Sequence, residues 1–539
     1  MFKNTPSFQT TDTYARRLAL LMQPAHRPLL LKGLQGIEKE SLRVRRDGML
    51  GLTPHPTALG SALIHAQLTT DYSESLLEII TPAQHTSDVM LEQLDMLHRY
   101  VYESIGDELL WNASMPCVLP PEEQIPIAQY GTSNIGRLKH VYRRGLALRY
   151  GKSMQCIAGI HYNFSLHEDI FRLLQQHERT DGSPLQYQSN SYLALIRNFR
   201  RSSWLLMLLF GASPALSRSF VRGCLNGLDT FDADTLFLPY ATSLRMSDLV
   251  GYQNTPGQSS VSADYNNLDN YLNTVANAIS QPYPPYKQLG TKRNGEWLQI
   301  NTNVLQMENE LYSTIRPKRI TQSGERPLHA LASRGVQYIE VRLLDIDPFE
   351  AIGISSNTAR FLEAYLLYCA LDESPLLYAA EHIEANNNFA CVVMQARRPG
   401  LELSRDGRLV SLQDWAIELL EKIELAAVLL DTQDGGGRYC AALSAQRTKV
   451  ENFALTPSAR ILDDMNTTGR SFIRFALEQS AKHASAMRAR PLSREMHDHY
   501  ATLAVRSLQQ QNEIEQAELG QFDQFMESYH AYTPHRINV

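Results

Sequence analysis

Short runs of alternating apolar and polar residues recur through the first two thirds of the chain, and this alternation is typical of half-buried β-strands. In one run, Glu38, Glu40, Leu42 and Val44 fall on the same side of a strand, which an Arg-Asp-Gly turn follows. The same pattern predicts strands in four further segments: 76–80, 160–164, 300–305 and 335–349. Because charged residues of several strands can point to one face, we expect an antiparallel sheet.

Apolar residues at helical spacing fill the connecting segments and most of the C-terminal part. Three helices are predicted before residue 350: 12–31, 86–106 and 190–211. Further on, Ser411 and Asp414 form a capping signature, and a long amphipathic run covers about 493–530. The predicted fold class is α+β. We expect a single unit over 1–539, with a catalytic sheet body at about 33–350 and a mainly helical C-terminal part at about 355–539.

Acidic residues interrupt the apolar faces of the predicted strands. Burying Glu38 and Glu40 beside Leu42 and Val44 costs several kcal/mol unless a cation lies there, so a metal is the simplest explanation. A strand whose glutamates face solvent explains the pattern equally well. Glu78 repeats the arrangement in the segment 76–80.

Two further strands carry candidate chemistry with an ordinary alternative. Glu340 and Arg342 lie two apart, so they either pair with each other or reach a metal and an anion side by side. His161 stands among Ile160 and Tyr162, where a histidine is more often a satisfied core residue than a ligand.

The stretch from Leu298 to Arg319 combines an expected strand with clustered charge. After the alternation at 300–305, Glu308, Glu310 and Tyr312 follow two apart, and three cations surround Pro317: Arg316, Lys318 and Arg319. Such a stretch suits a site that holds metal, phosphate and carboxylate together. The alternative is an edge strand with its charges turned to water.

Composition and charge exclude several classes of protein. The 539 residues are 43% hydrophobic and 20% charged, as in ordinary globular proteins, and the net charge of −6 argues against nucleic-acid or anionic-membrane binding. The N-terminal residues lack a signal-peptide core, and no apolar run is long enough to span a bilayer. The six scattered cysteines fit a reduced cytoplasm, with neither disulfides nor a zinc site. We therefore expect a cytoplasmic protein.

Familiar nucleotide and nucleophile motifs are missing. The segment GTKRNGE (290–296) has the glycine spacing of a P-loop without its Lys-Ser/Thr, and neither G-x-G-x-x-G after a strand nor G-x-S-x-G is found. The expected strands and their ends offer five acids and a histidine, a surplus of ligands suited to several Mg²⁺ or Mn²⁺ ions: Glu38, Glu40, Asp71, Glu78, Glu340 and His161. Since ATP brings about four negative charges, its site needs both metals and fixed cations, and this chain offers both.

Seven segments, in order from about 33 to 350, resemble the motifs of the proteobacterial type of glutamate–cysteine ligase (γ-glutamylcysteine synthetase): GIEKESLRV, TTDYSESLLEIITP, QYGTSNIGR, MQCIAGIHYNFS, LPYATSLRMSDL, INTNVLQMENELYSTIRPKR and YIEVRLLDIDPF. The resemblance implies a curved antiparallel sheet forming a funnel, as in glutamine synthetase and the guanidino kinases, flanked by helices. It also implies the first step of glutathione biosynthesis. ATP phosphorylates the γ-carboxylate of glutamate, and the amine of cysteine attacks to give γ-glutamylcysteine, ADP and phosphate.

The resemblance assigns roles by motif. The implied metal ligands, for Mg²⁺ or Mn²⁺, are Glu38, Glu40, Asp71, Glu78, His161 and Glu340. The residues implied to hold the amino-acid substrates are Tyr142, Gln155, Arg245, Tyr252 and Tyr312. Arg342 and Glu340 are expected to be catalytic, with Arg342 steadying the transferring phosphoryl group. Contact with ATP is expected from Arg316, Lys318 and Arg319.

Partners and rivals follow from the same assignment. We expect glutamate, cysteine and ATP as substrates, glutathione as a feedback inhibitor, and neither nucleic acid nor membrane as a partner. One rival is another carboxylate–amine ligase of this fold with a different amine acceptor. A second rival, from another class, is a non-catalytic metal- or nucleotide-sensing protein.

Overall fold

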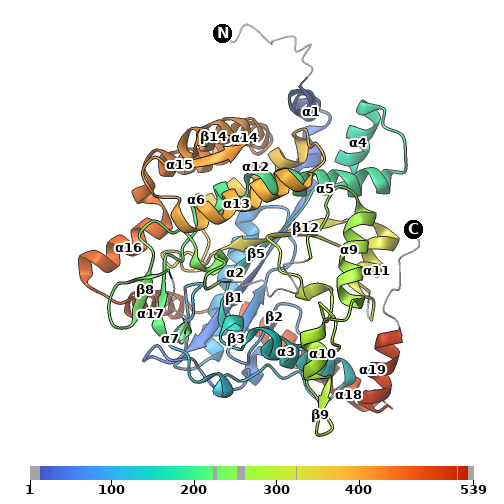
Figure 1. Ribbon diagram of the computed structural model, residues 1–539, viewed down its shortest axis with the longest axis vertical. Coiled ribbons are helices and arrows are strands. Elements are labelled where there is room, and N and C mark those ends of the chain that lie inside the picture. Colours follow the sequence, from blue (N-terminus) through green and yellow to red (C-terminus); the bar gives the residue numbers. More distant parts are fainter. Residues whose placement is uncertain (1–11, 222–226, 252–260, 323, 519, 532–539) are drawn as a thin grey trace.

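A single antiparallel sheet lies at the centre of the computed structural model, which describes residues 12–221, 227–251, 261–322, 324–518 and 520–531 (Figure 1). Its strands follow the order β11 (Ile315–Lys318), β12 (Tyr338–Leu344), β5 (Ile160–Ser165), β1 (Leu34–Val44), β3 (Leu76–Ile80) and β2 (Leu68–Thr70), and β4 (Leu109–Leu110) pairs with β1. Three small sheets accompany it: β6 (Ala215–Ser217), β8 (Thr235–Phe237) and β7 (Asp229–Thr230); β9 (Lys292–Arg293) and β10 (Glu296–Trp297); β13 (Glu402–Arg405) and β14 (Arg408–Ser411).

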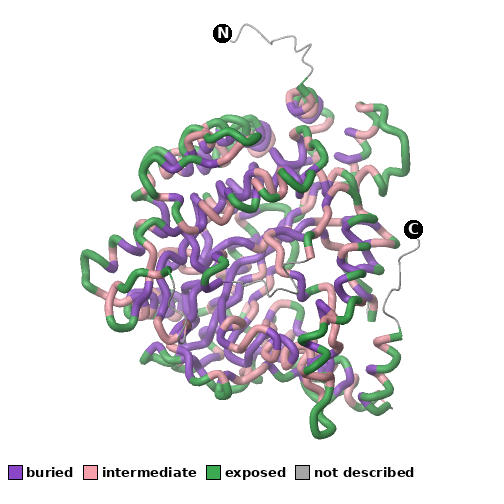
Figure 2. Tube along the Cα trace, in the orientation of Figure 1, coloured by how far each residue is buried: buried purple, intermediate pink, exposed green. Residues whose placement is uncertain are grey.

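Helices surround the sheet, and the purple, buried stretches of the chain gather at its centre (Figure 2). Their bounds are α1 (Thr13–Met22), α2 (Ser87–Ser104), α3 (Asn134–Tyr150), α4 (Glu168–Glu178), α5 (Pro184–Ser202), α6 (Trp204–Phe210), α7 (Arg218–Val221), α9 (Leu268–Ser280), α10 (Pro284–Leu289), α11 (Pro327–Arg334), α12 (Ser356–Leu371), α13 (Ala379–Gln395), α14 (Leu412–Asp434), α15 (Arg438–Glu451), α16 (Pro457–Thr468), α17 (Phe472–Arg488), α18 (Arg494–Ala517) and α19 (Phe522–Ala531). The α+β class is confirmed. Within the described residues, every helix is too short or too polar to cross a membrane.

The strand register brings the charged residues onto one face of the sheet. Glu38 lies opposite His161, and Glu40 lies opposite Glu78. On the next strand, Glu340 lies opposite Arg316 and Asn163. Since residues two apart in a strand share a face, these side chains form one row across five strands.

The other face of the sheet is packed against helices. α2 contacts both β1 and β3. Lys39, between the two glutamates of β1, points to this side, where its Nζ lies 3.1 Å from His98 Nε2 of α2 and donates to Ser41 Oγ at 2.8 Å. Burial lowers the pKa of Lys39 to about 7.

Several predicted elements are confirmed. The helix expected at 190–211 is present as α5 and α6, divided at Ser203. Ser411 caps α14 by accepting the Asp414 N–H, and Gly435, in the left-handed conformation at φ 78°, ends that helix. The run at about 493–530 consists of α18 and α19.

The prediction of a strand at 300–305 is wrong. Polar side chains bind the backbone there and replace strand pairing. Gln306 Oε1 accepts the Ile300 N–H at 3.0 Å, and Asn301 Oδ1 accepts the Asn303 N–H at 2.9 Å. Glu308–Glu310 is a short 3₁₀ helix, so the strand begins only at Ile315.

The C-terminal helix α19 returns to the sheet body and forms a second small core with α3. This core consists of Leu138, Val141, Ile300, Phe522 and Met526. Polar contacts hold the same helix, because the Trp297 indole N–H donates to Asp523 Oδ1 at 2.7 Å and His530 Nε2 lies 3.0 Å from the Ile300 carbonyl oxygen. α19 therefore joins α3 to the loop that leads into β11.

Candidate active site

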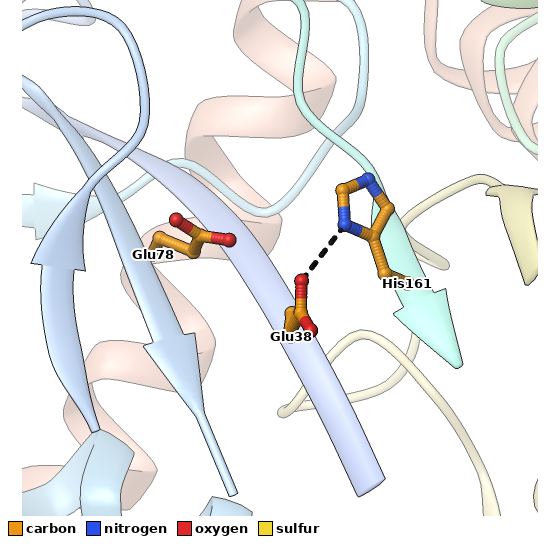
Figure 3. Close-up of side chains that lie close together, drawn as sticks. All are labelled: Glu38, Glu78 and His161. Carbon is orange, nitrogen blue, oxygen red and sulfur yellow. Dashed lines mark hydrogen bonds and ion pairs between the residues drawn. The ribbon is translucent and has the colours of Figure 1, made fainter. Parts of the chain in front are cut away.

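Glu38, Glu78 and His161 point into one space from β1, β3 and β5 (Figure 3). One donor atom of each side chain lies within 4.8 Å of the other two. His161 Nδ1 is 3.1 Å from Glu38 Oε2. Two carboxylates and an imidazole at this spacing form a donor set for a divalent cation.

Three further carboxylates extend this group. His161 Nε2 lies 3.7 Å from Glu40 Oε1, and its Nδ1 lies 3.9 Å from Glu340 Oε1. The Gly159 N–H fixes Glu40 by donating to Oε2 at 2.7 Å. Burial and the charge of Asp71, which directly follows β2, both raise the pKa of Glu40. The structure thus brings together all six residues expected as ligands, here named the acid cluster: Glu38, Glu40, Asp71, Glu78, His161 and Glu340.

Positive charge is distributed unevenly over the acid cluster. Burial and the neighbouring carboxylates, Glu38 first among them, raise the pKa of Glu78 well above its usual value. Burial alone would do the same to Glu340, but Lys318 and Arg342 hold its pKa well below the usual range. Their nitrogens lie 3.2 Å and 3.1 Å from its carboxylate oxygens. At the β3 end, the charge of Arg143 offsets this effect only in part, and Glu78 forms no ion pair among the described residues.

The donor set fits a hard divalent ion such as Mg²⁺ or Mn²⁺. Carboxylate oxygens dominate it, and the single imidazole suits Mn²⁺ as well. Asn163 supports this fit, because its Nδ2 donates to Glu38 Oε1 at 2.8 Å while its buried Oδ1 has no hydrogen-bond partner among the described residues.

The other two cations expected at ATP are engaged with the protein backbone. Arg316 is buried and donates to the carbonyl oxygens of Asn309, at 3.1 Å, and Leu311. Arg319 donates to the carbonyl oxygen of Arg334 at the end of α11. Only Lys318 of the three makes an ion pair with the acid cluster.

The residues expected to hold amino acids fall into two groups. Gln155 Nε2 donates to the Tyr312 hydroxyl at 3.0 Å, and burial together with Glu310 and Tyr312 raises the pKa of Tyr142 well above its usual value, which places these side chains together. Arg245 is buried and donates to the carbonyl oxygens of Leu343, at 3.1 Å, and Arg342, at 3.0 Å. Tyr252 lies outside the described residues.

A cavity of about 470 Å³ connects these groups. The expected residues that line it are His161, Arg245, Tyr312 and Arg342. Its wall also includes residues that the sequence did not single out: Arg200, Tyr265, His382 and Asn386. Arg200 lies in the last turn of α5, where a basic residue ordinarily serves the helix dipole, so no sequence signal distinguished it.

Fold and site together define a class of protein, namely α+β enzymes that handle anionic substrates on one face of an antiparallel sheet. The family model described as glutamate-cysteine ligase matches residues 18–392. The glutamate–cysteine ligase of Janthinobacterium sp. is 56% identical over 527 residues, which cover 98% of this chain and 99% of that protein. The ligase of Pseudomonas putida W619 is also 56% identical, over 97% of this chain and 98% of its own length.

Solved structures agree. The glutamate–cysteine ligase of Francisella tularensis, in complex with AMP, superposes with a TM-score of 0.87 at 35% identity, over 93% of this chain and 97% of that one. A bifunctional glutathione synthetase from Pasteurella multocida shares the fold, with a TM-score of 0.72 at 23% identity over 92% of this chain and 58% of that one. The chain belongs to the glutamate–cysteine ligase family. It is an ATP-dependent ligase that joins glutamate to cysteine in the first step of glutathione biosynthesis.

Proposed function

We propose that the acid cluster is the reaction centre, where the γ-carboxylate of glutamate is activated as γ-glutamyl phosphate. The observation that carries this proposal is the row formed by the carboxylates of β1, β3 and β12 and by His161 of β5, with Lys318 and Arg342 at one end. When bound, Mg²⁺ or Mn²⁺ offsets the repulsion between the phosphates of ATP and the substrate carboxylate. The residues that would hold it are Glu38, Glu40, Asp71, Glu78, His161 and Glu340.

The chemistry proceeds in two displacements. A γ-carboxylate oxygen of glutamate attacks the γ-phosphorus of ATP, and ADP leaves. The cysteine amine then attacks the acyl carbon, phosphate leaves, and the amine proton passes to phosphate or a nearby carboxylate. Arg342 and Lys318, held beside Glu340, place positive charge where negative charge develops on the phosphoryl group. Glu340 in turn fixes both cations.

The substrates and the nucleotide are assigned to neighbouring groups. Tyr142, Gln155 and Tyr312 hold an amino acid, as their mutual contacts support, and Arg245 and Tyr252 belong to the same assignment. Arg316 and Arg319 are assigned to closing the nucleotide site, with Lys318 nearest to phosphate. The AMP in the Francisella tularensis enzyme supports nucleotide binding in this fold.

The proposal extends to the shape and regulation of the enzyme. It includes the curved, funnel-like sheet of the glutamine synthetase and guanidino kinase type, one unit over 1–539, a cytoplasmic location and inhibition by glutathione. Inhibition by glutathione is supported by its chemistry, because glutathione contains the γ-glutamylcysteine unit that this enzyme makes.

Isotope transfer tests the acyl phosphate. Glutamate labelled with ¹⁸O in its γ-carboxylate is supplied with ATP, Mg²⁺ and cysteine, and the product and phosphate are analysed by mass. We expect one ¹⁸O in each molecule of inorganic phosphate and γ-glutamylcysteine as the peptide. Unlabelled phosphate would contradict the acyl phosphate. Equal ADP formation with other amines in place of cysteine would favour the rival ligase.

A further inference from the structure

Two adjacent arginines at the end of α5 have different surroundings. Arg201 pairs with the carboxylate of Glu381, with its Nε 2.5 Å from Oε1, and faces away from the 470 Å³ cavity. Arg200 lines that cavity, and no carboxylate forms an ion pair with it among the described residues. The uncompensated charge of Arg200 thus faces the space that also holds Arg342.

The guanidinium of Arg200 is held in place from several sides. Its Nη2 donates to Asn386 Oδ1 at 2.8 Å and lies 3.4 Å from His382 Nε2, and these two residues are one turn apart on α13. Its Cζ lies 5.6 Å from the centre of the Tyr265 ring. Its Nε is buried and has no hydrogen-bond partner among the described residues. Burial lowers the pKa of Arg200, and Tyr265 acts in the opposite direction.

The acids near Arg200 form no ion pair with it among the described residues. Asp264 accepts from Asn266 N at 2.7 Å and from Asn270 Nδ2 at 2.8 Å, so its carboxylate serves the start of α9. Asp248 lines the cavity without an ion pair to Arg200 among the described residues. A preorganised cation without a carboxylate partner among the described residues, lining a cavity that His161 and Arg342 also line, is suited to bind an anion.

We propose that Arg200, oriented by Asn386 and His382, binds the α-carboxylate of an amino-acid substrate. A planar guanidinium matches a planar carboxylate, whereas a triphosphate needs several cations and metals. The cavity volume falls within the usual range of about 300–1,000 Å³ for small-molecule sites and leaves room for more than one amino acid. The proposal rests on the ligase reaction at the acid cluster and adds a subsite to it.

Glutamate and cysteine both carry an α-carboxylate, and substrate analogues separate them. Cysteamine is cysteine without its carboxylate, and 4-aminobutyrate is glutamate without its α-carboxylate. For the wild type and Arg200→Met, kcat/KM is measured with each substrate and its analogue, or inhibition constants where an analogue does not react. We expect Arg200→Met to lower kcat/KM for one natural substrate by roughly 10–100-fold, as loss of a hydrogen bond to a charged group does. The value for the analogue of that substrate should change little, so the preference for the substrate over its analogue is largely lost.

The pair whose ratio collapses identifies the carboxylate that Arg200 binds. Arg200→Lys should lie between wild type and Arg200→Met, and Asn386→Ala should shift the same pair several-fold. These milder variants decide the matter if Arg200→Met fails to fold, as judged by its Tm. The matched control is Arg201→Met, which removes a neighbouring charge outside the cavity and should leave both ratios unchanged.

Two results would overturn the subsite. One is that both ratios stay at their wild-type values in Arg200→Met and Asn386→Ala. The other is that only the KM for ATP rises, which would make Arg200 a phosphate contact. In either case wild-type enzyme that still transfers ¹⁸O to phosphate keeps the proposed reaction intact, so the two proposals fail separately.

Discussion

Glu78 and Glu310 are both glutamates in the interior of the site region, but their partners differ. Among the described residues no ion pair reaches Glu78, whereas Glu310 Oε1 lies 2.9 Å from Arg149 Nη1 and accepts the Tyr150 hydroxyl at 2.8 Å. We expect Glu78→Gln to lower turnover by at least about 100-fold. It should also raise the stability of the metal-free protein by about 1 kcal/mol or more, because one unit of pKa shift corresponds to about 1.4 kcal/mol. Activity and thermal unfolding in EDTA measure the two effects.

Glu310→Gln is the matched control at the same scale. It removes the ion pair of the buried Arg149, and breaking a buried ion pair typically costs about 3–5 kcal/mol, so the unfolding temperature of this variant should fall clearly. A Glu78→Gln protein that is less stable than wild type without metal would mean that Glu78 has a structural partner instead of a missing cation.

At this scale the sequence predicted the acids better than the arginines. A glutamate on an apolar strand face is a local signal, so the four glutamates of the acid cluster could be named from the pattern, whereas Asp71 and His161 were expected as ligands from the resemblance. An arginine's partner depends on tertiary contacts. The sequence around Arg200 does not distinguish it from Arg245 or Arg319. Arg245 and Arg319 donate to backbone carbonyls, whereas Arg200 lines the cavity and forms no ion pair among the described residues.

Among the elements, β1 and β5 are linked to α12 and α15 by a buried hydrogen-bonded network. Gln35 Nε2 donates to Glu363 Oε2 at 3.1 Å, the Tyr439 hydroxyl donates to the same oxygen at 2.8 Å, and the Tyr162 hydroxyl donates to Gln35 Oε1 at 2.6 Å. Burial raises the pKa of Glu363 to about 7. The folded protein therefore holds this proton more tightly than the unfolded chain does.

The sign of the pH effect follows from that raised pKa. The stabilisation is complete below the unfolded pKa of about 4.3 and is lost as pH rises through about 7. We expect the difference in unfolding free energy between wild type and Glu363→Gln to fall by up to about 3 kcal/mol from pH 5 to pH 8. Denaturant titrations of both proteins at several pH values measure it. A difference that does not vary with pH would show that Glu363 titrates normally.

Element prediction succeeded where one periodicity governs a whole segment. β1, β3, β5 and β12 have apolar residues in alternation, and the helices have clear caps. It failed at 300–305, where Asn and Gln side chains compete with strand pairing, and it missed the β13–β14 hairpin. The signal for that hairpin was an Asp-Gly pair, Asp406 and Gly407, both at positive φ.

For the whole molecule, the unexpected feature is that α19 packs on α3. α3 carries Tyr142, and Ile300 in the same small core begins the loop to Tyr312, so α19 supports the two tyrosines that we propose to bind amino acids. Contacts between residues more than 200 positions apart, such as Trp297 with Asp523, leave no local pattern in the sequence. Helical periodicity therefore predicted that this segment is a helix, but it did not predict that the helix packs on α3.

Removal of α19 should misplace those tyrosines. We expect a chain ending at Glu518 to show a KM for glutamate or cysteine raised by up to about 100-fold, with a smaller change for ATP, since small displacements of positioning groups have effects of that size. The fluorescence of Trp297, which loses its Asp523 partner, reports the change. A chain that lacks only 532–539 keeps α19 and is the control. Equal rises for all three substrates would indicate general loosening instead.

The distance between β1 and β12 along the chain has a consequence for biosynthesis. Glu38 leaves the ribosome about 300 residues before Glu340, which at typical synthesis rates is a delay of roughly 15–60 s. During that time the carboxylates of β1 have β3 and then β5 beside them, but the cations of β11 and β12 do not yet exist. The nascent chain must therefore carry an unbalanced patch of negative charge, and nascent enzyme should be the form most sensitive to the magnesium concentration of the cell.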